Sequence, residues 1–525
     1  MEYIKDNKKH STRWFSLLIA SGIFLSRIAG LIRDRIFAHY FGNSDAADAF
    51  RAAFKIPNFL QNLFGEGVLS ASFIPVYSRL LAENRKEEAK QVAEAILSLL
   101  ILTISILTVI GILAAPALVD VIAPGFKNEK RELTIVLVKI LFPGAGLLVL
   151  SAWCLGVLNS HNRFFLSYTA PVIWNTALIA TMVAFGGTMM QYPLTECLAW
   201  GSVVGSGLQV IIQLPTVFSF IKGLRLTSDF LNKNARTVTR NFIPVFISRG
   251  VVQISSFVDS VLASLLPTGA VSALSYGQTL YMLPVSLFGM SVSAAELPAM
   301  SKALGNKDEI ALQLRNRLNS GLQRIALFII PTSMGFLALG DVVAAAIYQT
   351  GHFTHRDAVY VWSVLAGSAV GLLASTMGRL YSSAFYALQD TRTPLKFSII
   401  RVSLTIILGY ISAILVPPMI GINARWGVAG LTASAGIAGW IEFLLLRYNL
   451  KKRIGHTGIS FSYSSKLWTS AALAAATALA VQQFTHSFYP VIQAILILSP
   501  YGIVYFVSAY LMKIPLNIMS IRRMK

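Results

Sequence analysis

The chain has 525 residues, of which 55% are hydrophobic and only 13% are charged. This composition excludes a soluble globular protein of that length and indicates a polytopic membrane protein. The formal net charge of +21 is compatible with a nucleic-acid partner, but in a membrane protein the positions of the charges decide their meaning. The two cysteines, Cys154 and Cys197, lie in apolar runs, so neither a disulfide framework nor a metal site is predicted.

Apolar segments long enough to cross a bilayer recur along the whole chain, and there are about fourteen of them. They lie at residues 14–37, 46–77, 91–123, 133–158, 167–187, 193–221, 241–266, 270–300, 325–349, 358–388, 394–418, 425–446, 467–485 and 488–512. The predicted fold class is therefore an all-α polytopic membrane protein with about 14 transmembrane helices.

The basic residues fall unevenly on the two sides that this order of helices defines. Counting the loops alternately from a cytoplasmic N-terminus places most of the 44 Lys and Arg residues on the inner side. The outer loops hold Lys127, Lys130, Arg131, Arg356 and Arg425. This asymmetry follows the positive-inside rule and predicts that both termini are cytoplasmic. Most of the net charge then reflects topology and contact with anionic membrane lipids, and no nucleic-acid surface is expected.

The first segment ends in charged side chains that lie at the depth of the bilayer. An apolar run begins at Trp14 and leads into Arg27, Arg33, Asp34 and Arg35. A charge at the centre of a spanning helix costs roughly 2.5 to 3.5 kcal/mol on insertion scales, so we expect these groups to face a protein interior or a water-filled cavity. Arg27 and Asp34 are about two helical turns apart and are predicted to share one face.

Two further segments carry polar stripes. On the second segment, polar residues recur at spacings of three and four. They are Asp48, Arg51, Lys55, Asn58, Asn62 and Glu66. The stripe on the seventh segment consists of Arg249, Gln253, Ser256 and Ser260, with Asp259 at its margin. Stripes of this kind in otherwise apolar helices predict a hydrated cavity between helices.

Three other arginines, Arg35, Arg379 and Arg401, also lie within predicted helices. For these residues the alternative interpretation is that each one snorkels, or forms a structural ion pair, near a helix end. That interpretation is less favoured for Arg27 and Arg249.

Internal repetition divides the chain. Ser26-Arg27 and Ser248-Arg249 each lie in the first helix of a block of six helices, and the following helices, 54–81 and 281–304, share a mid-helix Pro and a Phe-Gly pair. Two blocks of six helices have the same orientation in the membrane, so they are predicted to be related by a pseudo-two-fold axis along the membrane normal, with a site between them. The predicted domains are an N-lobe at 1–225, a C-lobe at 226–455 and a C-terminal helix pair at 456–525.

Bends are expected in the second helix of each block. Pro57, Gly65 and Gly67 interrupt the first of these helices, and proline and glycine are common causes of helix kinks. The eighth helix is expected to bend at its own proline and glycine residues in the same way.

Catalytic patterns are missing from the sequence. It contains no Walker-type phosphate loop, paired-cysteine motif, HExxH or GxSxG, so we expect a transporter that is not an enzyme and needs no cofactor. The short loops leave no room for an ATPase domain. Transport is therefore expected to use an ion gradient, the membrane potential or the gradient of the cargo itself.

Several stretches together resemble the MurJ (MviN) lipid II flippase family, within the superfamily of multidrug and oligosaccharidyl-lipid exporters. They are SRIAGLIRDRIFAHYFG with AADAF, FKIPNFLQNLFGEGVLSASFIPVYS, APGF and VLNSHNRF. The resemblance implies fourteen helices in two lobes around a cationic cavity, and a final helix pair that forms a groove for a polyprenyl tail. The implied cargo is the polyprenyl-pyrophosphate-linked disaccharide-pentapeptide of peptidoglycan, moved to the outer leaflet of the bacterial inner membrane.

The resemblance also implies site residues. The first-helix arginines of the family fall on Arg27 and Arg33, with Asp34 beside the latter, and its second-helix aspartate falls on Asp48. Arginine suits a pyrophosphate because its planar fork can donate two hydrogen bonds to one anion.

The sequence departs from the family pattern at four cavity positions. Family members usually carry charged residues where this chain has Gln61 and Asn62 in the second helix and Gln278 and Thr279 in the eighth. We expect Arg51 (with Lys55 one turn away) and Arg249 to restore the cationic character of the cavity.

The mechanism that these features predict is alternating access between the two lobes. Asp259 is a candidate site for a coupling cation, and cell-wall synthases are candidate partners. The alternatives are a flippase for another polyprenyl-linked glycan, a cation-coupled drug exporter, or a non-transporting membrane scaffold of cell-wall synthesis. The positive sign of the buried charge argues against the drug exporter.

Overall fold

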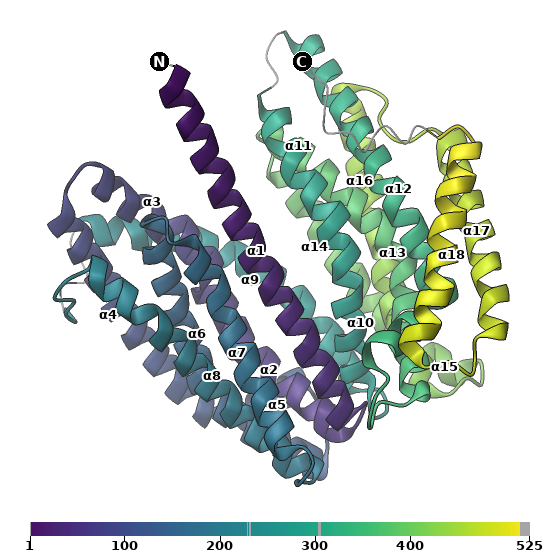
Figure 1. Cartoon of the computed structure of the whole chain (residues 1–525), viewed down its shortest axis with the longest axis horizontal. Helices are drawn as coiled ribbons and strands as arrows, with labels where there is room; N and C mark the ends of the chain where they lie inside the picture. The colour runs from purple at the N-terminus through teal and green to yellow at the C-terminus, as the bar shows by residue number, and fades with distance from the viewer. Residues whose placement is uncertain (1, 228, 230–232, 303–305, 515–525) are drawn as a thin grey trace. The chain divides into compact units, whose positions relative to one another are not determined.

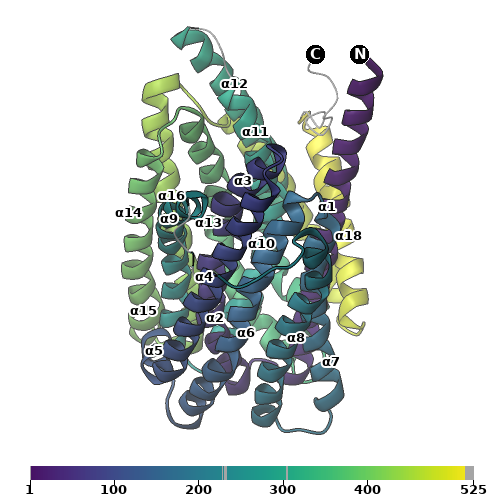
Figure 2. The same ribbon diagram turned by 90° about the vertical axis from the view of Figure 1, so that its left-hand side faces the viewer.

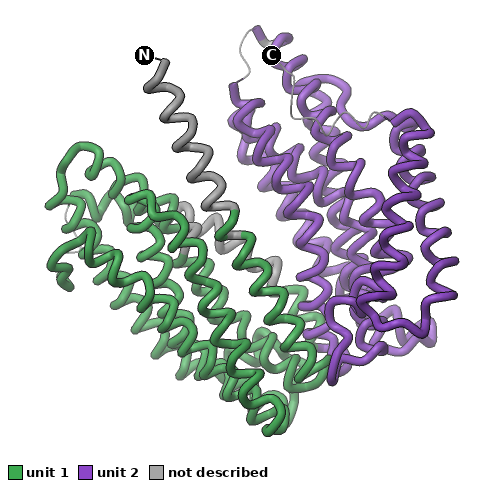
Figure 3. The backbone as a smooth tube through the Cα atoms, in the orientation of Figure 1, with its two compact units in different colours: residues 1–264 green, residues 265–525 purple. Residues whose placement is uncertain are grey.

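The structure is a computed structural model that describes residues 2–227, 229, 233–302 and 306–514. The side chains at 2–20, 23, 66–67, 244–245, 247–256 and 307 lie outside this description. Within the described ranges all regular elements are helical and no β-strand is present. The chain divides into two compact units, Met1–Ser264 and Leu265–Lys525 (Figure 3).

Within its described residues, unit 1 has nine α-helices (Figure 1). They are α1 (Glu2–Phe41), α2 (Asp45–Phe64), α3 (Glu66–Ala82), α4 (Lys86–Leu113), α5 (Ala115–Ile122), α6 (Asn128–Ser160), α7 (Phe164–Phe185), α8 (Gln191–Phe220) and α9 (Lys233–Ser264). Helix α6 lies at the centre of this unit and packs against α2, α3, α4 and α8, while α1 packs along α7. A core of large side chains that includes Phe73, Tyr77 and Trp153 joins α3 to α6.

Unit 2 is built around two long helices, α12 and α13 (Figures 1 and 2). Its elements are α10 (Ala270–Pro284), the π-helix η1 (Val285–Met290), α11 (Ser291–Ser301), α12 (Lys307–Tyr348), α13 (His355–Ala387), α14 (Arg392–Tyr410), the π-helix η2 (Ile411–Leu415), α15 (Val416–Met419), the short 3₁₀ helix η3 (Ala424–Trp426), α16 (Gly427–Ile454), α17 (Phe461–Phe484) and α18 (Pro490–Leu511). Helix α13 packs between α12 and α16, and the α17–α18 pair packs on α12.

Small residues allow α13 and α16 to approach closely. A Cβ atom added at Gly371 of α13 would collide with the backbone of Gly436 on α16, and one at Gly367 would collide with Thr432. In a bilayer, where lipid is as apolar as a leucine side chain, close backbone approach at small residues is a main source of helix association. Helix α13 is therefore held firmly against α16 at this crossing.

The all-α membrane fold predicted from the sequence is confirmed. Each predicted apolar segment coincides with one helix or with consecutive helices of the structure. Ten helical stretches within the described residues are long and apolar enough to cross a membrane by themselves. The total of about fourteen spans stays a prediction, as do the lobe boundaries after residues 225 and 455. The last helix of unit 1, α9, packs against α3.

The second segment of unit 1 is interrupted as expected, whereas the bend of the eighth helix stays a prediction. In unit 1 the second segment breaks at Gly65, which separates α2 from α3, and a Cβ atom there would collide with the carbonyl oxygen of Gln61. In unit 2 the corresponding segment changes from α-helix to π-helix directly after Pro284. Proline and a π-turn both disturb the regular backbone hydrogen bonds of a helix, so the segment of unit 2 departs from a regular α-helix at this point.

Candidate functional site

The first two helices of unit 1 place three charged side chains in direct contact. The Asp34 carboxylate on α1 accepts a hydrogen bond from Arg33 Nη2 at 2.9 Å and another from Arg51 Nη2 on α2 at 3.1 Å. Asp34 is only 4% exposed, and the two arginines are mostly buried. We call Arg33, Asp34 and Arg51 the arginine cluster. Two guanidinium groups share one carboxylate, so the cluster carries a net positive charge.

Neighbouring side chains hold the two guanidinium groups in place. Arg33 Nη1 donates a hydrogen bond to Asn175 Oδ1 on α7 at 3.0 Å, and its guanidinium lies 5.1 Å from the centre of the Trp174 ring. Arg51 lies over the Phe37 ring at 4.5 Å. Aromatic faces attract cations, and this attraction increases when water is excluded. The arginines are therefore fixed before any cargo binds.

A small cavity of about 30 Å³ lies beside the cluster inside unit 1. A water molecule needs roughly 10 to 15 Å³ of such volume, so the cavity holds a few waters at most and not the headgroup of a glycolipid. In this arrangement the Asp34 carboxylate occupies the anion position of both guanidinium groups. An oxyanion that reached the cluster would compete with Asp34 for the same donors.

The predicted site residue Asp48, one helical turn before Arg51 on α2, pairs with a lysine of α6. Its Oδ2 atom accepts a hydrogen bond from Lys130 Nζ on α6 at 2.7 Å, and the same ammonium contacts Asp45 Oδ1 at 2.8 Å. Lys130 also lies over the Phe126 ring. These contacts fasten the beginning of α2 to the beginning of α6, next to the N-cap residue Ser44. Asp48 therefore has a structural partner that the sequence analysis had assigned to an outer loop.

Lys55 and Asp259 lie near each other within unit 1. They interact electrostatically across α2 and α9, and the neighbouring Phe59 and Phe257 rings make an edge contact at 5.1 Å between their centres. The candidate cation site at Asp259 thus lies within electrostatic reach of an ammonium group of the protein itself.

Of the two first-helix and seventh-helix arginines that were predicted to line the cavity, Arg27 does not join the arginine cluster, and Arg249 lies outside the described side chains. Arg27 is exposed on α1, although it was expected to share a face with the buried Asp34. The polar face of α1 is thus buried at Asp34 and open at Arg27. Arg249 lies on α9, but its side chain is outside the described residues.

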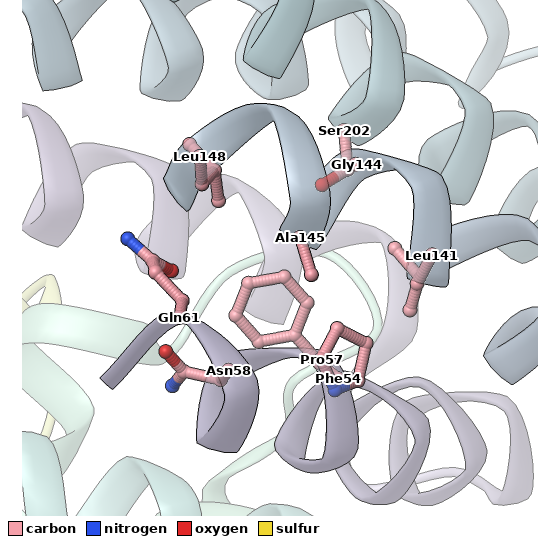
Figure 4. A pocket seen from close by; sticks show the side chains of 9 residues that line it. All are labelled: Phe54, Pro57, Asn58, Gln61, Leu141, Gly144, Ala145, Leu148 and Ser202. Atoms are coloured by element: carbon pink, nitrogen blue, oxygen red, sulfur yellow. The ribbon is translucent and has the colours of Figure 1, made fainter. Parts of the chain in front are cut away.

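Two of the positions at which family members usually carry a charge are Gln61 and Thr279, and they lie at a second, smaller cavity and on α10. Gln61 and Asn58 of α2 line a cavity of about 10 Å³ together with Ser202 of α8 (Figure 4). This cavity has room for a single water molecule. Thr279 donates its hydroxyl hydrogen to the carbonyl oxygen of Ser275 in its own helix. Neither Gln61 nor Thr279 supplies a charge to its surroundings.

Three residues that contact the predicted site were not among the predicted site residues: Trp174, Asn175 and Lys130. Asn175 gave a usable signal, because an asparagine within the apolar segment 167–187 needs a polar partner in the membrane. Lys130 gave none, since a lysine before a spanning helix is common and its partner is distant in sequence.

Comparisons with known proteins agree with this architecture. The family model described as "Lipid II flippase MurJ" matches residues 37–513 of the chain. A lipid II flippase MurJ of Burkholderia cenocepacia is 30% identical over 445 residues, which cover 83% of this chain and 84% of that protein.

Solved structures share the fold. A structure titled "Lipid II flippase MurJ, inward closed conformation" superposes with a TM-score of 0.75 at 24% identity and covers 94% of this chain and 98% of that one. An inward-facing multidrug resistance transporter of the MATE family gives a TM-score of 0.62 at 16% identity, covering 83% of this chain and 98% of its own. The fold is thus shared with exporters that differ widely in sequence.

Proposed function

The chain belongs to the family of lipid II flippases called MurJ, and we propose that it carries lipid II from the inner to the outer leaflet of the bacterial cytoplasmic membrane by alternating access. The observation that carries this proposal is the family match over nearly the whole chain. The arginine cluster, a buried group of net positive charge on the first two helices, provides the chemistry that such a cargo requires.

The cargo couples an apolar polyprenyl tail to a pyrophosphate, a disaccharide and a pentapeptide. Its pyrophosphate is a compact multiple anion, and arginine forks in a place with little water bind such anions far better than exposed lysines do. In the empty protein Asp34 holds Arg33 and Arg51 together. When cargo arrives, the pyrophosphate takes over some of these hydrogen bonds, and Asp34 limits the net charge that remains after release.

The proposed orientation places both termini in the cytoplasm, because this puts most basic loops on the inner side. Rocking of the two lobes would use the breaks at Gly65 and after Pro284 as bending points. Membrane potential, negative inside, would favour return of an empty cationic cavity by about 2.3 kcal/mol per charge and 100 mV.

Two finer parts of the proposal concern ions and partners. A coupling cation at Asp259 would have to displace the Lys55 ammonium from its neighbourhood, so binding of one would exclude the other. Cell-wall synthases, which use the cargo on the outer side, are the proposed protein partners.

Rescue of a bacterium depleted of its own lipid II flippase tests this function. The wild-type chain is expected to restore growth, whereas Arg33→Ala is expected to fail at equal membrane abundance, because it removes one fork and leaves Asp34 with a single partner. Failure of the wild-type chain to rescue despite normal abundance would contradict the proposed function.

A further inference from the structure

Unit 2 has a polar cluster of its own around the middle helix α13. We call it the α13 polar cluster, and it consists of Tyr281, Ser375, Arg379, Arg401 and Glu442. Helix α13 is largely buried, and Met377, Gly378, Leu380 and Tyr381 are all buried around this position, but Arg379 itself is exposed. An exposed arginine in the middle of a buried helix points to an opening on one side of α13.

Two contacts connect the neighbouring helices around Arg379. The Tyr281 hydroxyl of α10 lies 2.8 Å from Ser375 Oγ, one turn before Arg379. On the other side, Arg401 Nη1 of α14 donates to Glu442 Oε2 of α16 at 3.2 Å. Arg379 interacts electrostatically with Tyr281, Arg401 and Glu442. These groups surround one guanidinium without neutralising it.

The carboxylate nearest to Arg379 already has other partners. Glu442 Oε2 is bound by Arg401 and Glu442 Oε1 accepts a hydrogen bond from Ser398 Oγ at 2.8 Å. Among the residues that the structure describes, no carboxylate lies within ion-pair distance of the Arg379 guanidinium. The α13 polar cluster therefore has two arginines for one glutamate and a net charge of one positive unit.

Free space adjoins the α13 backbone directly before Arg379 and the α16 backbone three residues before Glu442. A Cβ atom added at Gly378, the residue before Arg379, would meet no other atom within 4 Å, and the same holds for Gly439 on α16, three residues before Glu442. Helix α14 packs mainly on α16 and hardly on α13. The helices that are tightly joined at Gly371 and Gly436 are thus less closely packed at Gly378 and Gly439.

The depth of the cluster makes exposure to lipid costly. Arg379 lies eight residues before the end of α13 at Ala387, and so about 12 Å from that end. Under the proposed orientation this end is cytoplasmic. The guanidinium then lies in the cytoplasmic half of the hydrocarbon core of the bilayer. A charge at such a depth faces water or a bound partner, because contact with lipid tails is unfavourable.

We propose that the α13 polar cluster is an oxyanion site at which Arg379 binds a lipid-borne phosphate group that enters from the cytoplasmic side. Tyr281 supports the anion with its hydroxyl, and the Arg401–Glu442 pair holds the second guanidinium beside it. The phosphate is either the pyrophosphate of lipid II or the headgroup phosphate of an anionic phospholipid. The first source rests on the proposed function, whereas the second does not.

Native mass spectrometry of the full-length protein in detergent tests the site, with purified lipid II and phosphatidylglycerol as separate probes. Arg379→Gln is expected to weaken binding of one of the two probes, the one that occupies this site, about tenfold, because one charge-assisted pair of hydrogen bonds is lost. Arg379→Lys keeps the charge without the fork and is expected to lose about threefold. Lys396→Gln, which removes an exposed cation in the first turns of α14, is the matched control and is expected to bind like wild type.

The two probes separate the outcomes. Loss of lipid II binding alone identifies the cargo as the ligand, and loss of phosphatidylglycerol binding identifies an anionic phospholipid. If Arg379→Gln binds both probes as wild type does, the oxyanion site is refuted. If the wild-type protein does not bind lipid II at all, the proposed function fails, while the phosphatidylglycerol comparison still decides the site. Arg379→Lys controls for misfolding. If Arg379 had only a structural role, lipid affinity would not decrease stepwise from wild type to Arg379→Lys to Arg379→Gln while the melting temperature stayed the same.

Discussion

The arginine cluster of unit 1 and the α13 polar cluster of unit 2 each contain two arginines and one carboxylate, but they differ in how the carboxylate is shared. In unit 1 a buried carboxylate, Asp34, bonds both arginines directly. In unit 2 the carboxylate of Glu442 pairs with only one of the two arginines, Arg401, and Arg379 is exposed. In unit 1 both guanidinium groups are hydrogen-bonded to a carboxylate of the protein, whereas in unit 2 the Arg379 guanidinium has no carboxylate partner among the described residues and is accessible to an anionic ligand. Burial and pairing, not the residue type, decide how ready an arginine is to bind an anion.

Removal of the central carboxylate should have the largest effect. Asp34→Ala leaves two mostly buried guanidinium groups side by side, and we expect the free energy of unfolding to fall by about 3 to 5 kcal/mol. Glu442→Ala removes a carboxylate from a more exposed pair, and about 1 kcal/mol is expected. Reversible unfolding in mixed detergent measures both. Equal losses would show that the two clusters do not differ in the way described.

A second substitution should partly restore the first. Once Asp34 is replaced by Asn, Arg51→Gln removes one of the two repelling charges, so the double variant should be more stable than Asp34→Asn alone by about 1 to 2 kcal/mol. The same unfolding measurement gives the coupling energy. Strict additivity of the two single changes would mean that Arg51 and Asp34 act independently.

The adjacent residues Lys130 and Arg131 provide a test of burial alone. Lys130 pairs with the buried Asp48, whereas Arg131 pairs with the exposed Asp120 at 2.6 Å. Lys130→Gln should cost about 2 kcal/mol, because it leaves a buried carboxylate without its cation. Arg131→Gln should cost less than about 0.5 kcal/mol. The melting temperatures of the two variants under identical conditions test this difference. A larger loss for Arg131→Gln than for Lys130→Gln would contradict it.

Acid should produce the smallest effect, at a loop in unit 2. Hydrogen bonds from the Thr393 side chain and backbone, with a further contribution from Arg453, lower the pKa of Asp390 from 3.8 to about 2. A lowered pKa in the folded protein contributes stability above the unfolded value, and that stability is lost as the pH falls from about 4 towards 2. The difference in melting temperature between wild type and Asp390→Asn should therefore be small at pH 7 and shrink below pH 4. A difference that grows with acid would contradict this sign.

Local composition was enough to predict the helices and the family, because hydropathy and the SRIAGLIRDR motif are local properties of the sequence. It also placed Arg33, Asp34 and Arg51 among the candidates, since charges within apolar segments must find polar surroundings. What it did not supply was pairing. The hydrogen bonds from Arg33 to Asn175 and from Lys130 to Asp48 join residues more than 80 positions apart, and only tertiary packing brings them together.

The same limit explains why Arg27, a predicted site residue, does not join the arginine cluster. Helical spacing put Arg27 and Asp34 on one face, but that face is buried by α2 and α7 at Asp34 and left open at Arg27. Spacing along one helix predicts a direction and cannot predict where the neighbouring helices end.

The central claim is that the arginine cluster moves the pyrophosphate of lipid II, and the most direct measurement is the amount of lipid II in the outer leaflet of cells that depend on this chain. Wild type and Arg131→Gln should both expose lipid II there, because Arg131 lies outside the cluster. The double variant Arg33→Gln with Arg51→Gln should accumulate it in the inner leaflet at equal abundance in the membrane. Outer-leaflet lipid II at the wild-type level in the double variant would contradict the account.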